Sequence, residues 1–197
     1  MNKKSVSSDS TFYICFSSDI KKNDCLIKYV NAYSFCIGDR ILSEISEILK
    51  KSNGLINRLS VIHYDYFELV KPFFGRSDEH KTDGEYEAIG IGNYLEGMGD
   101  LAYLILDDGK ARKFVKRHFP KLDRKMVGTI GFIRDSCCRD QSINPNDALA
   151  ILDAIKTRIE NENGARPCGM DSAKYKEILM PIQDEIKRWV DLQFGEN

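Results

Sequence analysis

The sequence predicts an α/β fold in which a mostly parallel central sheet is flanked by helices and followed by a C-terminal helical extension. Segments typical of strands and of amphipathic helices alternate through most of the first 160 residues, as in repeated βαβ units. The segment Leu101–Leu106 lacks a polar face, which is typical of a strand that a parallel sheet buries on both sides. After the linker-like segment Asn161–Gly169, apolar residues recur at helical spacing from Tyr175 to Val190.

Residue type and spacing place the individual elements. The expected strands, rich in aromatic or aliphatic residues, are Thr11–Phe16, Ala32–Ile37, Leu101–Leu106 and the short strand and turn Met126–Ile133. The expected helices have an apolar face and start near Asp24, Asp39, Gly84, Lys110 and Pro145. The segment Leu59–Leu69 fits either a strand or a short helix, and Lys71–Lys81 predicts a loop. We expect a loose tail over residues 1–10, one domain over 11–160, and a linker with the helical extension over 161–197.

Composition indicates an ordinary soluble protein with a cytoplasmic location. The 197 residues are 42% hydrophobic and 30% charged, and the formal net charge is −1, so any surface that binds nucleic acid must be local. No apolar run approaches the roughly 20 residues that a membrane span needs, and the first residues lack a signal-peptide core. The six cysteines form no Cys-x-x-Cys pair, so we expect reduced thiols and no zinc site.

Two adjacent acids follow the most apolar strand. Asp107 and Asp108 come directly after Leu101–Leu106, where open α/β sheets place their binding sites. Neighbouring carboxylates repel each other unless a cation or a basic group lies between them. The sequence therefore suggests part of a metal-binding acidic site.

Three short motifs surround this acidic pair. They are Gly-Glu-x-Glu-Ala-Ile at 84–89, Leu-Ile-Leu-Asp-Asp-x-x-Ala-Arg at 104–112, and Val-Gly-Thr-Ile-Gly at 127–131. In this order they resemble the PIN-domain family, metal-dependent ribonucleases that include VapC-type toxins. A weaker match runs through Phe12–Phe16 as the first strand and Ile41–Ile45 as the helix with the family's second acid. The resemblance covers roughly residues 11–160 and implies a three-layer sandwich.

The resemblance also implies an activity and a set of site residues. It implies an endoribonuclease in which carboxylates hold Mg²⁺ or Mn²⁺, which activates a water to hydrolyse RNA. The implied metal ligands are Asp19, Glu44, Glu85 and Asp108. Asp107 would take part directly or through a water, Thr129 would order a metal-bound water, and Lys110, Arg112, Lys113 and Lys116 would contact the RNA backbone. Besides RNA, the expected partners are an antitoxin protein, if the chain is a toxin, and a second copy of the chain.

One departure from the family pattern supports a different function. The family usually places an aspartate straight after the first strand, but Ser17 follows Thr11–Phe16 here and Asp19 lies two residues further on. The alternative is therefore a catalytically degraded PIN-like domain that binds RNA or a protein. A phosphate-handling Rossmann-like enzyme ranks lower, because no glycine-rich loop follows the first strand.

Each candidate residue also has a purely structural interpretation. Asp107 and Asp108 precede a glycine, as turn and N-cap residues often do. Glu85 near a helix start would favour the helix dipole, and Glu44 would be solvent-facing. The basic run 110–117 is also typical of a solvated helix face.

Overall fold

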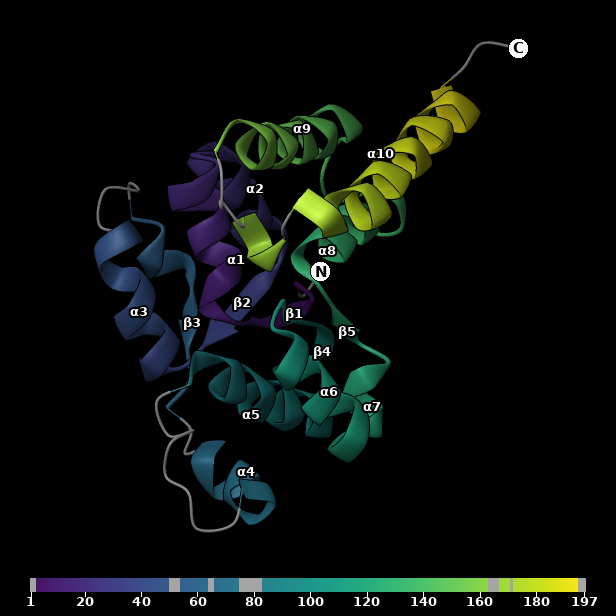
Figure 1. Cartoon of the computed structure of the whole chain (residues 1–197). Helices are drawn as coiled ribbons and strands as arrows, with labels where there is room; N and C mark the ends of the chain where they lie inside the picture. The colour runs from purple at the N-terminus through teal and green to yellow at the C-terminus, as the bar shows by residue number, and fades with distance from the viewer. Residues whose placement is uncertain are drawn as a thin grey trace.

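A five-stranded sheet forms the centre of the computed structural model, which describes residues 3–49, 54–63, 66–74, 83–162, 167–170 and 172–194. The strands are β1 (Ser5–Ser8), β2 (Ser34–Ile37), β3 (Ser60–Val61), β4 (Leu101–Ile105) and β5 (Met126–Val127). Their order is β3-β2-β1-β4-β5, and all four pairings between these strands are parallel (Figure 1). The predicted α/β class with a parallel central sheet is confirmed.

Helices cover both faces of the sheet and make three layers. In Figure 1 the upper layer holds α1 (Ser10–Ile14), the π-helix η1 (Cys15–Asp19), α2 (Asn23–Ala32) and α8 (Thr129–Cys138). The lower layer holds α5 (Gly84–Gly97), α6 (Gly109–His118) and α7 (Pro120–Asp123), with α4 (Tyr66–Phe74) packed on α5. Between the layers, α3 (Asp39–Leu49) packs against both α1 and α5, and the short turn η2 (Ile56–Arg58) precedes β3.

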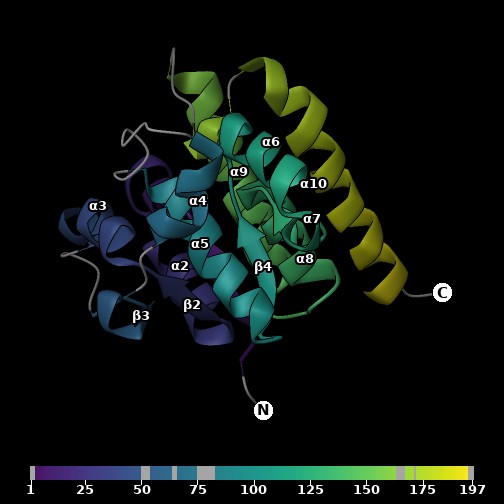
Figure 2. The same ribbon diagram turned by 90° about the horizontal axis from the view of Figure 1, so that it is seen from below.

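The C-terminal part packs outside α8. Helix α9 (Pro145–Asn161) contacts α8, and the turn η4 (Pro167–Gly169) contacts α1 and α9. Helix α10 (Ser172–Phe194) packs against both α8 and α9, and Figure 2 shows it running along the outer side of α8. Its buried apolar residues in the described part of the chain are Tyr175, Leu179 and Ile186, so the expected helical extension packs on the domain.

The aromatic segment predicted as the first strand is helical instead. Phe12 and Phe16 are four residues apart, lie on one helix face and hold their ring centroids 5.0 Å apart. The ring of Phe12 also stacks on Phe35 of β2, so the aromatic residues fill the core above the sheet. The prediction of a strand at Thr11–Phe16 was wrong because aromatic content indicates burial but does not by itself separate a strand from a buried helix.

The true first strand lies inside the segment predicted as a loose tail. Val6, Ser7 and Ser8 of β1 are fully buried, and β1 pairs with β2 on one side and β4 on the other. Ser7 Oγ donates a hydrogen bond of 2.8 Å to the carbonyl of Ala88 in α5. Small serines let α5 approach the central strand, and the same serines gave the sequence its tail-like polarity. Residues 5–8 therefore correct the predicted tail at 1–10 and the domain start at 11.

The other predicted elements differ less from the structure. Strand Ala32–Ile37 is confirmed as β2, and Leu101–Leu106 is confirmed as β4. The strand predicted at Met126–Ile133 ends at Val127, and helix α8 begins at Thr129. Leu59–Leu69 contains both β3 and the start of α4. The predicted loop Lys71–Lys81 is helical through Phe74, and its remainder, like residues 163–166 of the expected linker, lies outside the described residues.

Two cysteines that the sequence predicted to be reduced form a disulfide. Cys15 of η1 is bonded to Cys168 of η4, with Cα atoms 5.4 Å apart and a sequence separation of 153. Cys25, Cys36, Cys137 and Cys138 are free thiols, as expected. The disulfide ties the start of the C-terminal extension to the helical layer above the sheet.

None of the described helices combines the length and the apolar character needed to cross a membrane.

Candidate active site

The order in which the chain adds strands to the sheet reverses between β1 and β4. From β1 the chain continues to β2 and β3 on one side, and then to β4 and β5 on the other. Ligands of open α/β sheets bind at such a switch point, beside the carboxyl ends of the strands. Asp9 directly follows β1 and Asp107 follows β4 after one residue, so two acids meet at this position.

Asp9 is a buried carboxylate with one unpartnered oxygen. Asp9 is 1% exposed, and its Oδ2 accepts a hydrogen bond of 3.2 Å from the backbone amide of Asp107. Its Oδ1 has no hydrogen-bond partner among the described residues. Burial raises the pKa of Asp9 well above its ordinary value, and the carboxylates of Asp107 and Glu85 raise it further. The backbone amides of Asp107 and Phe12 act in the opposite direction.

Thr129 holds Asp107 in place. Asp107 Oδ1 accepts a hydrogen bond of 2.8 Å from the backbone amide of Thr129, and Oδ2 accepts one of 2.6 Å from Thr129 Oγ1. A Cβ at the preceding Gly128 would lie 3.0 Å from Asp107 Oδ1, which explains the glycine of the Gly-Thr motif. Burial raises the pKa of Asp107, although the Thr129 bonds and the Arg112 guanidinium oppose this effect. Thr129 therefore orients a carboxylate.

Glu85 and Glu44 add carboxylates on the side of α5. Burial raises the pKa of Glu85, and the nearby carboxylates of Asp108, Asp83 and Glu44 contribute in that order. A Cβ at Gly84 would lie 2.9 Å from Glu44 Oε2, so Glu44 reaches the first turn of α5. Glu44 Oε1 also pairs with Arg40 Nε at 3.1 Å. The acids from α3 and α5 therefore lie near the acids from β1 and β4.

Asp108 has a structural role in addition to its place at this rim. Its Oδ1 accepts hydrogen bonds from the backbone amides of Lys110 at 2.8 Å and Ala111 at 2.7 Å, which caps the start of α6. This is the N-cap alternative that its position before Gly109 indicated.

Asp19, which was expected to supply the first acid, lies at the end of η1. Burial raises its pKa, and Arg158 of α9 lowers it, so its charged neighbour belongs to the C-terminal part that packs outside α8. Asp9 instead directly follows the true first strand. The sequence does contain a hint of this: Asp9-Ser10-Thr11 precedes an apolar run, as residues at a helix start often do.

Glu87 is a buried acid to which the sequence analysis gave no role. Its carboxylate accepts hydrogen bonds from the backbone amides of Arg40 at 3.0 Å and Ile41 at 2.7 Å, and so caps α3. A Cβ at Gly38 would overlap this carboxylate. The second acid of the Gly-Glu-x-Glu motif therefore fixes α3, the helix that carries Glu44.

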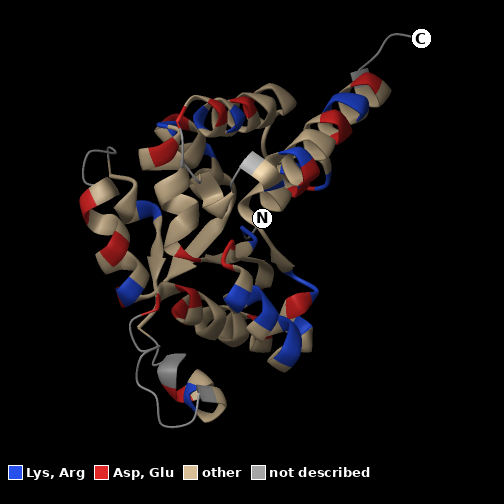
Figure 3. Cartoon of the chain, in the orientation of Figure 1, with Lys and Arg blue, Asp and Glu red and all other residues tan. Residues whose placement is uncertain are grey.

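The basic residues after the acidic pair lie on α6. Figure 3 shows Lys and Arg positions gathered on α6 and α7, below the sheet. Lys110, Lys113 and Lys116 are exposed, whereas Arg112 is half-buried and donates a hydrogen bond of 2.9 Å from Nη1 to the carbonyl of Leu106. The local basic surface that the near-neutral chain would need is therefore present beside the acids.

The chemistry of the acids suits a hard divalent cation. No three His, Cys, Asp or Glu side chains in the described part of the chain already stand at metal-holding positions. Mg²⁺ and Mn²⁺ prefer oxygen ligands, and Mg²⁺ keeps several waters while binding through one or two carboxylates and substrate phosphates. The Oδ1 of Asp9 beside Asp107 matches such a site, because it is a buried carboxylate oxygen without a hydrogen-bond partner among the described residues.

Comparisons with protein-family models, with curated proteins and with solved structures found no match for this chain.

Proposed function

We propose that this chain is a PIN-type, metal-dependent endoribonuclease that hydrolyses RNA phosphodiester bonds with Mg²⁺ or Mn²⁺. The observation that carries the proposal is the unpartnered Oδ1 of Asp9, buried beside Asp107 at the switch point of a parallel sheet. A buried carboxylate beside a half-buried one, both with raised pKa values, makes an arrangement that a divalent cation would stabilise.

The residues of the site would divide the work as follows. Asp9 and Asp107 hold the cation, with Thr129 fixing Asp107 and the Asp107 amide fixing Asp9. A bound cation lowers the pKa of a water and neutralises charge on the phosphodiester. Glu85 and Glu44 supply further carboxylates at the rim. The exposed lysines of α6 then contact the phosphates of the RNA on either side of the cleaved bond.

Asp9 also bears on the two alternatives. The degraded-domain hypothesis was motivated by the missing aspartate at Ser17, but an aspartate directly follows the true first strand. A Rossmann-like phosphate site remains disfavoured because residues 9–14, which follow β1, contain no glycine.

Cleavage of a labelled single-stranded RNA with Mn²⁺ or Mg²⁺ tests the proposal. We expect Asp9→Asn and Asp107→Asn to lower the cleavage rate at least about 100-fold, since each removes a charge that would hold the cation. Asp19→Asn is the matched control and should cleave at nearly the wild-type rate. Asp108→Asn keeps a capping side chain and should fold normally.

Two results would contradict this proposal: no metal-dependent cleavage by the wild type, or wild-type rates in both Asp9→Asn and Asp107→Asn. RNA binding without cleavage, unchanged by Mn²⁺, would favour the degraded binding module. Growth arrest on expression, relieved by Asp107→Asn and by co-expression of a neighbouring gene product, would extend the proposal to a toxin with an antitoxin partner.

A further inference from the structure

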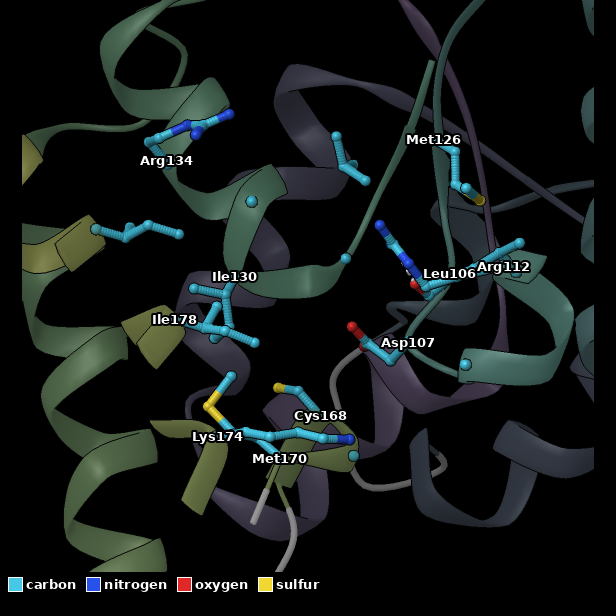
Figure 4. A pocket seen from close by; sticks show the side chains of 16 residues that line it. Leu106, Asp107, Arg112, Met126, Ile130, Arg134, Cys168, Met170, Lys174 and Ile178 are labelled. Carbon is cyan, nitrogen blue, oxygen red and sulfur yellow. Dashed lines mark hydrogen bonds between the residues drawn. The ribbon is translucent and has the colours of Figure 1, made fainter. Parts of the chain in front are cut away.

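A cavity of about 470 Å³ opens directly beside Asp107 (Figure 4). It lies between the domain and the C-terminal extension, so that β5, α6 and α8 form one side and η4 and α10 the other. Its lining includes Asp107, Arg112, Ile130, Met170, Lys174 and Ile178. This volume is within the roughly 300–1,000 Å³ typical of small-molecule sites.

The lining combines apolar side chains with basic ones. In Figure 4, Ile130 and Ile178 lie on the side of the cavity away from Asp107, with Met170 below them. Three basic residues, Arg112, Arg134 and Lys174, share the described lining with a single acid, Asp107. An apolar interior with an excess of positive charge suits a ligand that has both a flat apolar body and an anionic group.

The basic residues come from three different elements. Arg112 of α6 is anchored through Nη1 to the carbonyl of Leu106, beside Asp107. Arg134 of α8 pairs with the neighbouring Asp135 at 2.6 Å, and Figure 4 shows it at the edge of the cavity. Lys174 of α10 reaches in from the side opposite Asp107 (Figure 4). The cavity therefore exists only because the C-terminal extension packs on the domain.

We propose that this cavity is a nucleotide-binding subsite that takes one unstacked RNA nucleotide next to the cleaved bond. The inference rests on the proposed nuclease function, because Asp107 belongs both to the candidate metal site and to the cavity wall. The base packs against Ile130, Ile178 and Met170, and Arg112 and Lys174 face the phosphate. A base inside an A-form helix stays stacked and cannot enter, so the subsite selects unpaired RNA. The C-terminal extension thereby determines which nucleotide is accepted.

The test measures binding of a labelled single-stranded RNA and of the same sequence as a duplex, by fluorescence anisotropy in EDTA, where no divalent cation supports cleavage. Gly131→Leu puts a side chain into the cavity. Gly131→Ala is its control, because a Cβ there meets Val127 Cβ at an ordinary 3.7 Å. Lys174→Glu reverses one charge of the lining, and Lys176→Glu makes the same change on an exposed residue of α10 outside it.

We expect the wild type to bind the single strand at least about 10-fold more tightly than the duplex, which corresponds to 1.4 kcal/mol. Gly131→Leu and Lys174→Glu should each weaken single-strand binding by about 10-fold or more, and both controls should stay within about 2-fold of the wild type. Circular dichroism checks the fold of each variant, and exposed Lys174 gives a second variant if Gly131→Leu does not fold. Inorganic phosphate or a nucleoside 5′-monophosphate should compete in the wild type.

Wild-type binding by folded Lys174→Glu protein, or equal affinity for single strand and duplex, would overturn the subsite. The two proposals fail separately. If metal-dependent cleavage requires Asp9 but is unaffected in rate and sequence preference by Gly131→Leu and Lys174→Glu, the nuclease proposal stands and the subsite is wrong. If binding depends on the cavity but no cleavage occurs, the cavity is an RNA site and the nuclease proposal is wrong.

Discussion

At the scale of single residues, the candidate site places two carboxylates close together, which destabilises the folded protein. Asp9 is buried and Asp107 is half-buried, and the two carboxylates repel each other when both are ionised. Thr129 partly compensates Asp107, but Asp9 keeps an oxygen without a partner among the described residues. Buried carboxylates whose pKa values are raised by neighbouring acids are typical of functional sites.

The raised pKa of Asp9 predicts how stability depends on pH in the metal-free protein. The folded state binds this proton more tightly than the unfolded chain, whose pKa is near 3.8, so stability should fall as pH rises above that value. Asp9→Asn removes the charge and should therefore raise the melting temperature at pH 7 in EDTA. The gain should shrink as the pH falls toward 4, because Asp9 of the folded wild type takes up its proton well above that pH.

Thermal melts of the wild type and Asp9→Asn from pH 4 to pH 8 in EDTA give this comparison. Asp19→Asn is the control, because Arg158 offsets part of the burial effect there. A loss of stability in Asp9→Asn that is the same at every pH would show that Asp9 acts as an ordinary hydrogen-bonded core residue.

At the scale of elements, the helices are fixed by the same motifs that supply the acids. Asp108 caps α6 and Glu87 caps α3, so each motif carries a structural residue beside a candidate functional one. Gly38 and Gly128 are needed because a Cβ at either position would crowd a carboxylate, of Glu87 in the first case and of Asp107 in the second. These contacts explain the residue spacing of the motifs independently of any family.

The disulfide between Cys15 and Cys168 should stabilise the packing of the C-terminal extension. It closes a loop of 153 positions, and disulfides of this kind typically contribute about 2–4 kcal/mol to the free energy of unfolding. We therefore expect the double variant Cys15→Ser/Cys168→Ser to lose about that much stability in urea unfolding. Since Cys168 lines the cavity beside Asp107, the variant should also bind single-stranded RNA more weakly than the wild type.

Reductant gives the decisive comparison for this disulfide. It should lower the unfolding midpoint of the wild type and leave the double variant unchanged, while Cys138→Ser, at a free thiol, should respond as the wild type does. A wild-type midpoint that reductant does not move would contradict the role of the disulfide.

At the scale of the whole molecule, the sequence predicted the layers better than the first strand. Alternating apolar segments were sufficient for the α/β class, because buried parallel strands such as Leu101–Ile105 lack a polar face. The central strand escaped prediction because it is only four residues long and three of them are serines, which are buried by neighbours distant in sequence. Neither hydrophobicity nor periodicity shows that α5 will close over Ser7.

Because the first strand was misplaced, the wrong residue was also predicted for the first acid of the candidate site. Asp107 follows a strand and Glu85 begins a helix that the sequence placed correctly. Thr129 was identified from the Gly-Thr motif, although it begins a helix in a segment predicted as a strand and turn. Asp9 was missed because its strand was missed, and Asp19 was chosen from the end of a segment that is helical. The cavity could not be predicted at all, since it requires α10 to pack against α8.

Calorimetric titration of Mn²⁺ into the protein tests the central claim, that Asp9 and Asp107 form a cation site at the switch point between β1 and β4. The account predicts binding by the wild type and by Asp19→Asn, and binding weakened at least about 10-fold in Asp9→Asn and in Asp107→Asn. Mn²⁺ binding that Asp9→Asn leaves intact while Asp19→Asn abolishes it would contradict the account.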